Sequence, residues 1–184
     1  MPTKIGMVSL GCPKNQVDAE QMLAGLAAAG YEITPEEAEA DAIIVNTCGF
    51  IEEAKAEAIE NILEAAAYKQ TGRLQALIVT GCMAERYRDD ITAEIPEADV
   101  VVGIGSNRDI VSIVADALKG KKQNAYGPKE ALDLDAPRML STPPYTAYLK
   151  LGDGCDNCCT YCAIPQIRGR FRSRPMEGLI EEAE

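Results

Sequence analysis

The sequence predicts an α/β fold, an open parallel sheet with helices on both faces. Over the first 119 residues, short apolar runs alternate with helical patterns in the order β-α-β-α-β-α-β-α. The apolar runs are continuous rather than alternating, which is typical of strands buried on both faces. Because crossovers between parallel strands are right-handed, the helices should cover both sides of such a sheet.

Four apolar runs are the expected strands. They are short, they consist mostly of Ile, Val, Leu and Ala, and a polar residue or a glycine follows each of them. They span residues 5–10, 42–45, 74–79 and 99–102. A doubly wound sheet of this kind is of the Rossmann or flavodoxin type.

Helices are expected after each of these strands. Asn15 is a good first residue for a helix that ends at Gly30, because glycine favours the left-handed position after a helix. A short helix is expected from 84 to about 94, because Pro96 disfavours its continuation. In two further helices, apolar residues at i, i+3, i+4 and i+7 mark one face: Ile59, Ile62, Leu63 and Ala66, and Ile110, Ile113, Val114 and Ala117.

The character of the chain changes after residue 119. Residues 120–144 are polar and rich in helix breakers, and we interpret them as a linker with at most one short edge strand. Residues 145–151 are strand-like again, and a helix is expected to begin at Met176. The segment 145–184 is too short to be an independent domain of this composition. We therefore interpret it as the truncated start of a second domain.

The composition excludes several kinds of chemistry in this chain. There is no His, which excludes His-based acid–base catalysis and His-containing zinc sites. The chain has 18 basic and 29 acidic side chains, a net charge of −11, so no direct DNA binding is expected. No signal segment and no apolar run of about 20 residues is present, so we expect no membrane contact and a cytoplasmic location. Thiols stay reduced there, and cysteines usually bind metal or take part in catalysis.

Three of the seven cysteines follow closely on the first three expected strands. Cys12, Cys48 and Cys82 are 36 and 34 residues apart, which corresponds to one β-α unit each. The carboxyl ends of parallel strands share the edge of the sheet where ligands bind in such folds. One free cysteine is often simply a small buried residue, but three at the same structural position favour a metal site. Three thiolates without His suit an iron–sulfur cluster with one open iron, and a three-Cys zinc site is the weaker alternative.

The remaining four cysteines lie in a dense group near the end of the chain, and their spacing has two interpretations. Two adjoining C-x2-C pairs would suggest zinc, but zinc ribbons separate such pairs by about 15–20 residues. The other interpretation, C-x3-C-x2-C, uses Cys155, Cys159 and Cys162 and leaves Cys158 outside. This spacing resembles the signature of radical S-adenosylmethionine (SAM) enzymes, in which three cysteines hold a [4Fe–4S] cluster and the fourth iron binds SAM.

With both cysteine sets in view, the chain resembles the methylthiotransferase family of radical SAM enzymes. The resemblance runs from Lys4 to Pro175, nearly the whole chain. It is carried by residues 11–15 (Gly-Cys-Pro-Lys-Asn), 46–48 (Asn-Thr-Cys), 81–82 (Gly-Cys), the motif at 155–162, and the stretch Ala163-Ile164-Pro165 with the arginine-rich residues 167–175.

The resemblance implies a domain organisation and a set of ligands. Residues 1–119 would hold an auxiliary [4Fe–4S] cluster on the first three cysteines, whose open iron would carry the sulfur to be methylated and inserted. Residues 145–184 would begin the radical SAM β/α barrel, and Tyr161 would lie near the adenine of SAM. Members usually also carry the rest of the barrel and a TRAM domain, which this sequence lacks. The position of Cys158 is usually basic in the family, so the chain departs from the pattern there. No catalytic residue is assigned.

Two branches of the family differ in substrate. One methylthiolates an adenosine-derived base in tRNA, and the other methylthiolates the β-carbon of an aspartate in a small-subunit ribosomal protein. Residues 11–15 and 167–170 resemble the ribosomal-protein branch. Before residue 145 there are 13 basic and 23 acidic side chains, a net charge of −10, which disfavours a polyanion and is compatible with a basic protein. We therefore expect the ribosomal-protein aspartate as substrate and a reductant such as flavodoxin or ferredoxin.

A non-catalytic alternative is an iron–sulfur or zinc binding module that stores metal or carries electrons. A ferredoxin-like carrier usually has a fourth cysteine ligand for each cluster, whereas both sets here leave one position open. An open position suits chemistry better than storage.

Four arginines lie at alternate positions shortly after the last cysteine. In a strand, alternate side chains point the same way, so all four could line one edge. That edge would be either a solvated face or a substrate-binding surface. The four are Arg168, Arg170, Arg172 and Arg174.

Overall fold

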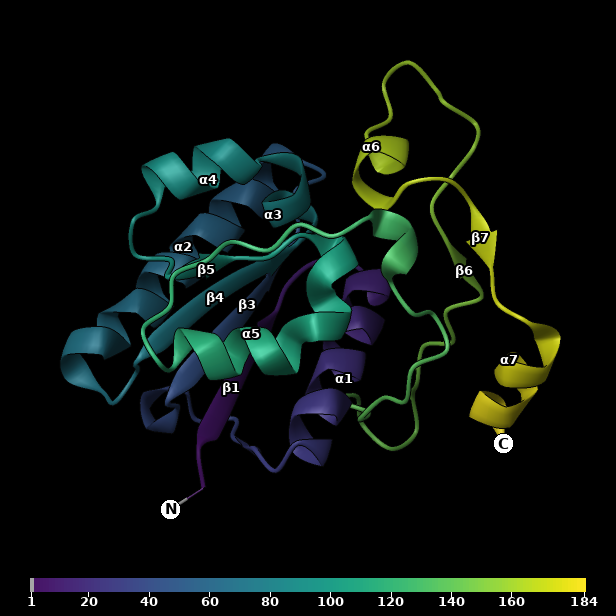
Figure 1. Ribbon diagram of the computed structural model, residues 1–184. Coiled ribbons are helices and arrows are strands. Elements are labelled where there is room, and N and C mark those ends of the chain that lie inside the picture. Colours follow the sequence, from purple (N-terminus) through teal and green to yellow (C-terminus); the bar gives the residue numbers. More distant parts are fainter. Residues whose placement is uncertain (1) are drawn as a thin grey trace.

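A five-stranded parallel sheet in the order β2-β1-β3-β4-β5 forms the centre of the structure, a computed structural model that describes residues 2–184 (Figure 1). All four neighbouring pairs are parallel, and β3 is the middle strand. The strands are β1 (Lys4–Ser9), β2 (Glu32–Ile33), β3 (Ala42–Thr47), β4 (Ala76–Gly81) and β5 (Val100–Val101). The expected parallel α/β sheet is thereby confirmed.

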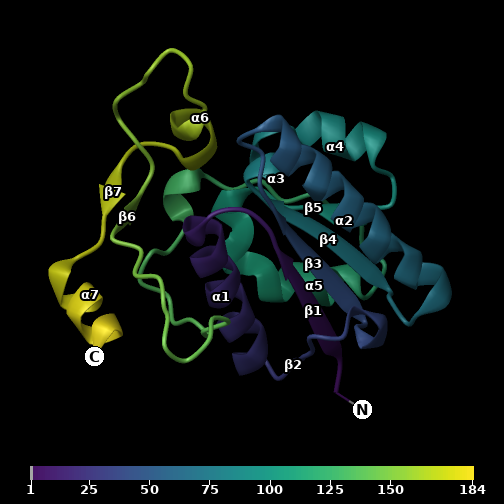
Figure 2. The same cartoon turned by 180° about the vertical axis from the view of Figure 1, so that it is seen from behind.

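Helices cover both faces of this sheet, as Figures 1 and 2 show from opposite sides. α1 (Pro13–Ala28) and α5 (Ile110–Ala117) pack on one face, where Ile44 and Ile78 are fully buried. α2 (Glu52–Thr71), α3 (Cys82–Arg86) and α4 (Arg88–Glu94) pack on the other face. Successive strand residues point to opposite faces, so continuous apolar runs supply both cores. Short 3-10 turns connect these elements at Glu37–Glu39, Ile104–Asp109 (η2) and Lys129–Ala131.

Two local expectations are corrected in this part of the chain. The short strand β2 was not expected, because its two residues carry no apolar run and form a strand only by pairing with β1. The single helix expected over 84–94 is two helices, because the backbone of Tyr87 leaves the helical region at φ −120° and ψ 46°. Residues 120–144 contain no strand, and only an isolated bridge joins Ala125 to Val102.

The last 40 residues lie against the carboxyl edge of the sheet and against α1 (Figure 2). They form β6 (Gly152–Asp153), α6 (Ile164–Arg168), β7 (Arg172–Ser173) and α7 (Met176–Ala183). β6 and β7 are antiparallel, and α6 packs against α3. Because the described part of this segment holds no parallel β/α unit, the start of a barrel remains a prediction.

The strand expected over 145–151 is wrong. These residues are apolar enough for a strand, but no strand lies beside them to complete a hydrogen-bonded ladder. The carbonyl of Leu151 accepts a hydrogen bond from the Arg174 backbone N–H at 3.0 Å, and regular pairing begins only at Gly152. Tyr145 and Leu151 remain exposed.

None of the helices within residues 2–184 combines the length with the apolar character that crossing a membrane would require.

Candidate metal centre

Cys12, Cys48 and Cys82 all lie at the carboxyl edge of the sheet. Cys12 is the residue that precedes α1, three positions after β1 ends. Cys48 directly follows β3, and Cys82 directly follows β4 as the first residue of α3. Because β1, β3 and β4 are adjacent and parallel, their carboxyl ends carry the three cysteines to one edge.

Two glycines allow the three cysteine-bearing loops to approach one another. A Cβ on Gly11 would lie 2.7 Å from the Cys48 Cβ and 3.2 Å from its Sγ, and the φ of Gly11 is +99°. A Cβ on Gly49 would lie 2.7 Å from the Cα of Met83, the residue after Cys82. Side chains at these two positions would push the loops apart.

The Asn15 side chain connects the ends of the strands. Its amide nitrogen donates to the carbonyl of Leu10 at 2.9 Å and to that of Thr47 at 3.0 Å, so it joins the segments after β1 and at the end of β3. In return the Asn46 amide donates to the Asn15 carbonyl at 2.7 Å. Asn15 was expected to cap α1, but it makes no such cap, because its side chain satisfies these buried carbonyls instead.

A buried set of four charges lies beside Asn15. Arg168, at the end of α6, donates to the carboxylates of Asp18 in α1 and Asp153 in β6. Lys150 donates to Asp18 at 2.6 Å and lies 3.0 Å from Asp153. All four side chains are at most 2% exposed. Two cations and two anions make the set neutral, which is what burial of charges requires. Half-exposed Lys14 lies 3.6 Å from the second oxygen of Asp153.

The second amino group of Arg168 reaches the cysteine edge. It donates to the Asn15 Oδ1 at 2.9 Å and to the Cys82 Sγ at 3.3 Å. A small apolar cluster surrounds this contact and includes Cys82, Ile104 and Ile167. The C-terminal segment is therefore bound to the sheet edge by both ionic and apolar contacts.

These charges shift the pKa values of their neighbours. Burial alone would raise the pKa of Asp153, but Arg168 and Lys150 outweigh it and lower that pKa to about 2. Burial alone would lower the pKa of Arg168, and the carboxylate of Asp18 contributes most to raising it well above its usual value. Burial raises the pKa of the Cys82 thiol, and Arg168 opposes this shift only in part. Asp153 and Arg168 therefore stay ionised at neutral pH.

Cys155, Cys159 and Cys162 lie on the loop between β6 and α6. The Cys155 N–H donates to the Gly169 carbonyl at 3.1 Å, and the Cys162 N–H donates to that of Cys159 at 3.0 Å. Cys158 has a positive φ of 49°, and its side chain is exposed. The side chain of Tyr161 is 90% exposed.

The donor chemistry of the sheet edge fits an iron–sulfur cluster. Its cysteines are free thiols, the soft ligands that such clusters use. Within residues 2–184, no group of three or more Cys, Asp or Glu side chains is arranged to hold a metal ion. Three free thiols without a histidine match the donor chemistry of such a cluster.

The arginine series lines neither a solvated face nor a substrate-binding edge. Arg168 and Arg174 are buried, and Arg174 pairs with Asp135 at 2.7 Å. Arg172 donates to the backbone carbonyls of the 129–132 segment. Only Arg170 has an exposed side chain. The interpretation as one strand edge is wrong because the four residues belong to a helix end, a loop and a two-residue strand.

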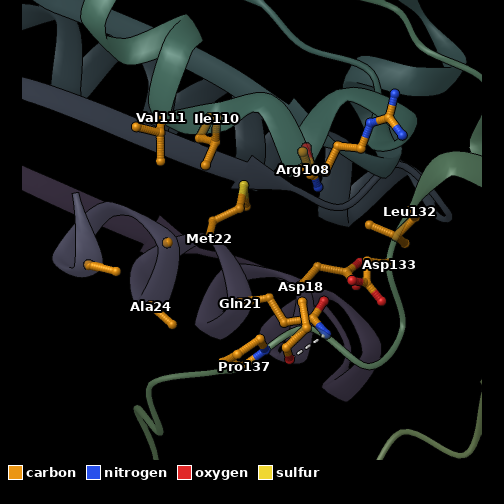
Figure 3. Close-up of a pocket in the computed structure, with 14 residues that line it drawn as sticks. Asp18, Gln21, Met22, Ala24, Arg108, Ile110, Val111, Leu132, Asp133 and Pro137 are labelled. Carbon is orange, nitrogen blue, oxygen red and sulfur yellow. Dashed lines mark hydrogen bonds between the residues drawn. The ribbon is translucent and has the colours of Figure 1, made fainter.

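A cleft lies between α1, η2 and α5, and Asp18 is among the residues that line it (Figure 3). It has a volume of about 290 Å³ and is lined by apolar residues such as Met22 and Ile110, together with residues of the 132–137 segment. Gln21 donates there to the carbonyls of Leu134 and Ala136. No cysteine lines this cleft, so we interpret it as the seam where the 120–144 segment packs on α1.

The sequence reasoning missed Asp18, Lys150 and Asp153. Asp18 follows Asn15 by three positions and so lies on the same face of the helix. This spacing could have indicated that Asp18 lies close to Asn15. Lys150 and Asp153 are separated from Asp18 by more than 130 residues, and no local pattern pairs them.

Replacing Gly11 should destabilise the protein more than replacing Gly30. Both have a positive φ, of 99° and 91°, but only Gly11 faces a neighbour within 4 Å. We expect Gly30→Ala to cost about 1–2 kcal/mol from strain alone and Gly11→Ala about 1–3 kcal/mol more from overpacking. Urea unfolding of the metal-free protein measures both, and equal losses would contradict the close packing of the loops.

Replacing Lys150 should leave the buried set with an excess negative charge. We expect Lys150→Met to cost about 3–5 kcal/mol, because it removes one partner from a buried ionic set. The matched control is Lys121→Met, which removes an exposed pair with Asp116 and should leave the unfolding midpoint unchanged. Thermal or urea unfolding distinguishes the two, and a stable Lys150→Met protein would show that the set is not needed for folding.

Comparisons with known proteins identify the family and several relatives of the chain. Residues 4–103 match a family model described as "Uncharacterized protein family UPF0004". The chain is 54% identical over 187 residues to "Ribosomal protein uS12 methylthiotransferase RimO" of Desulforamulus reducens, a match that covers 100% of the chain and 42% of the relative. It is 51% identical to the protein of the same name from Trichlorobacter lovleyi, a match that covers 98% of the chain and 41% of the relative. It is 54% identical to that from Pelotomaculum thermopropionicum, with 100% of the chain and 42% of the relative covered.

The chain thus spans about two fifths of the length of these curated relatives. The family model covers the strands and helices that form the cysteine-bearing sheet edge. The family model matches more than half of the residues of the chain, and the chain therefore belongs to the UPF0004 protein family.

Proposed function

We propose that this chain is part of a methylthiotransferase that modifies the β-carbon of an aspartate in ribosomal protein uS12. The observation that carries the proposal is the pairing of two three-cysteine sets, one at the sheet edge and one on the adjoining loop. The similarity to proteins named uS12 methylthiotransferase over the whole chain supports the same reading. Each set supplies three cysteines, with Cys158 outside the C-x3-C-x2-C spacing, so each would leave one position for an exchangeable ligand.

Six cysteines would hold two [4Fe–4S] clusters. The auxiliary cluster would be held by Cys12, Cys48 and Cys82, and the SAM-binding cluster by Cys155, Cys159 and Cys162. Bound SAM and the clusters would supply methyl transfer to sulfur and a 5′-deoxyadenosyl radical that removes hydrogen from carbon.

The protein side chains position these groups. Exposed Tyr161 is available to contact the adenine of SAM. Asn15 and Arg168 fix the sheet edge relative to the loop that carries the second set. The aromatic and apolar residues Phe50 and Ile51, next to Cys48, are half-exposed and could exclude water from a bound substrate.

The charge of the chain supports a basic protein substrate. The segment before residue 145 has a net charge of −10, which attracts a basic ribosomal protein and repels a nucleic-acid backbone. The reductant would be a flavodoxin or a ferredoxin, and the reaction would take place in the cytoplasm, where ribosomes and reduced thiols are found.

The assignment of the second cluster predicts a clear difference between neighbouring cysteines. In the full-length protein, replacing Cys155, Cys159 or Cys162 by Ala should each remove one cluster's worth of iron and abolish SAM cleavage. Cys158→Ala is the matched control and should retain both, because Cys158 lies outside the C-x3-C-x2-C spacing. Anaerobic iron and sulfide analysis, with a SAM-cleavage assay, measures this. Loss of the cluster in Cys158→Ala alone would refute the assignment.

The proposed substrate predicts a specific mass change. In cells that lack the gene, uS12 should lose its methylthio group, while methylthio-modified tRNA should remain. Mass spectrometry of ribosomal proteins and of digested tRNA from the same cells compares the two. Loss of the tRNA modification with an intact uS12 would assign the protein to the tRNA branch, and clusters without SAM cleavage would favour a non-catalytic iron–sulfur module.

A further inference from the structure

Arg168 contacts one cysteine set, and the residue that follows it contacts the other. Its Nη2 is 3.3 Å from the Sγ of Cys82, which belongs to the sheet-edge set. The next residue, Gly169, accepts the hydrogen bond of the Cys155 N–H at 3.1 Å, and Cys155 is the first cysteine of the loop set. One side chain and the carbonyl beside it therefore connect cysteines that are 73 residues apart in the sequence.

The contacts of Arg168 are divided between its two amino groups. Nη1 faces the carboxylates of Asp18 and Asp153, and Arg168 and Lys150 together neutralise these two negative charges. Nη2 faces no carboxylate and donates to Asn15 and to Cys82 instead. The ionic contacts hold the guanidinium in place, and its second amino group is thereby directed at the sulfur.

The same set also fixes the start of the cysteine loop. The second carboxylate oxygen of Asp153 accepts the backbone N–H of Gly154 at 2.9 Å. Cys155 follows Gly154 directly, so the loop set begins at a residue whose position depends on the carboxylate that Arg168 contacts. The contacts of Arg168 therefore reach Cys82 directly and the start of the loop set through Asp153.

We propose that Arg168 is a positioning residue that tunes the auxiliary cluster through the Cys82 sulfur and fixes its place relative to the SAM-binding loop. The proposal rests on the proposed function, because it takes Cys82 to be a cluster ligand. A charge-assisted hydrogen bond to a ligand sulfur stabilises the reduced, more negative state of an iron–sulfur cluster and so raises its reduction potential. Arg168 is at most 3% exposed, so water does not replace this donor.

The test measures the auxiliary cluster alone. The parent is the full-length protein with Cys155, Cys159 and Cys162 replaced by Ala, in which only the sheet-edge set can hold a cluster. Arg168→Lys keeps the positive charge beside Asp18 and Asp153 but has no second amino group for Cys82. The control is Arg170→Lys, a nearby arginine with an exposed side chain. Iron content, the electron paramagnetic resonance spectrum and the reduction potential are measured in each.

We expect Arg168→Lys to bind as much iron as the parent, with a more negative reduction potential and an altered spectrum. Arg170→Lys should match the parent in all three measurements. Equal iron with an unchanged potential in Arg168→Lys would overturn the inference and leave the proposed function intact. A parent that binds no iron would instead refute the assignment of Cys12, Cys48 and Cys82, and the inference with it.

A second variant covers the case in which Arg168→Lys does not fold. The double variant Asp18→Asn with Arg168→Gln removes one negative and one positive charge, so the buried set stays neutral. Its potential should also be more negative than that of the parent at equal iron content. Loss of folding in both variants, measured by circular dichroism, would assign Arg168 a purely structural role and overturn the proposal.

Discussion

The arrangement of the candidate site depends on one buried ionic set, in which Arg168 and Lys150 neutralise Asp18 and Asp153. Removing charges from water costs several kcal/mol for each ion, and only mutual pairing offsets that cost. The set therefore forms only when α1, β6 and α6 are all in place. Every charge of the set is paired only when the C-terminal segment lies in this position on the sheet.

Asn15 extends this constraint to the sheet itself. Its side chain donates to carbonyls beyond β1 and at the end of β3, and its oxygen accepts from Arg168. Backbone groups at the end of a parallel sheet no longer have a neighbouring strand to pair with, and a buried one must find another partner. Asn15 supplies that partner and so fixes the loops that carry Cys12 and Cys48. These hydrogen bonds connect the strand ends where the cysteines gather.

The loop set of cysteines has a different character. Cys159 is exposed and Cys155 and Cys162 are half-buried, and several apolar side chains around β6 and α7 are exposed as well. The chain corresponds to only about two fifths of its curated relatives. Cys82 at the sheet edge is buried, whereas no cysteine of the loop set is.

The sequence alone determined the sheet, the helices on both faces and the cysteine edge, because these follow from local patterns. Apolar runs specify buried strands, and parallel strands bring the residues after them to one edge, which located Cys12, Cys48 and Cys82. Only the tertiary structure decided which groups Arg168 contacts. The alternating pattern of arginines had predicted that it lies on a strand edge. Its partner Asp18 lies 150 residues away. No local periodicity encodes such a pairing, because it is the need to neutralise buried charges in the folded chain that brings the two residues together.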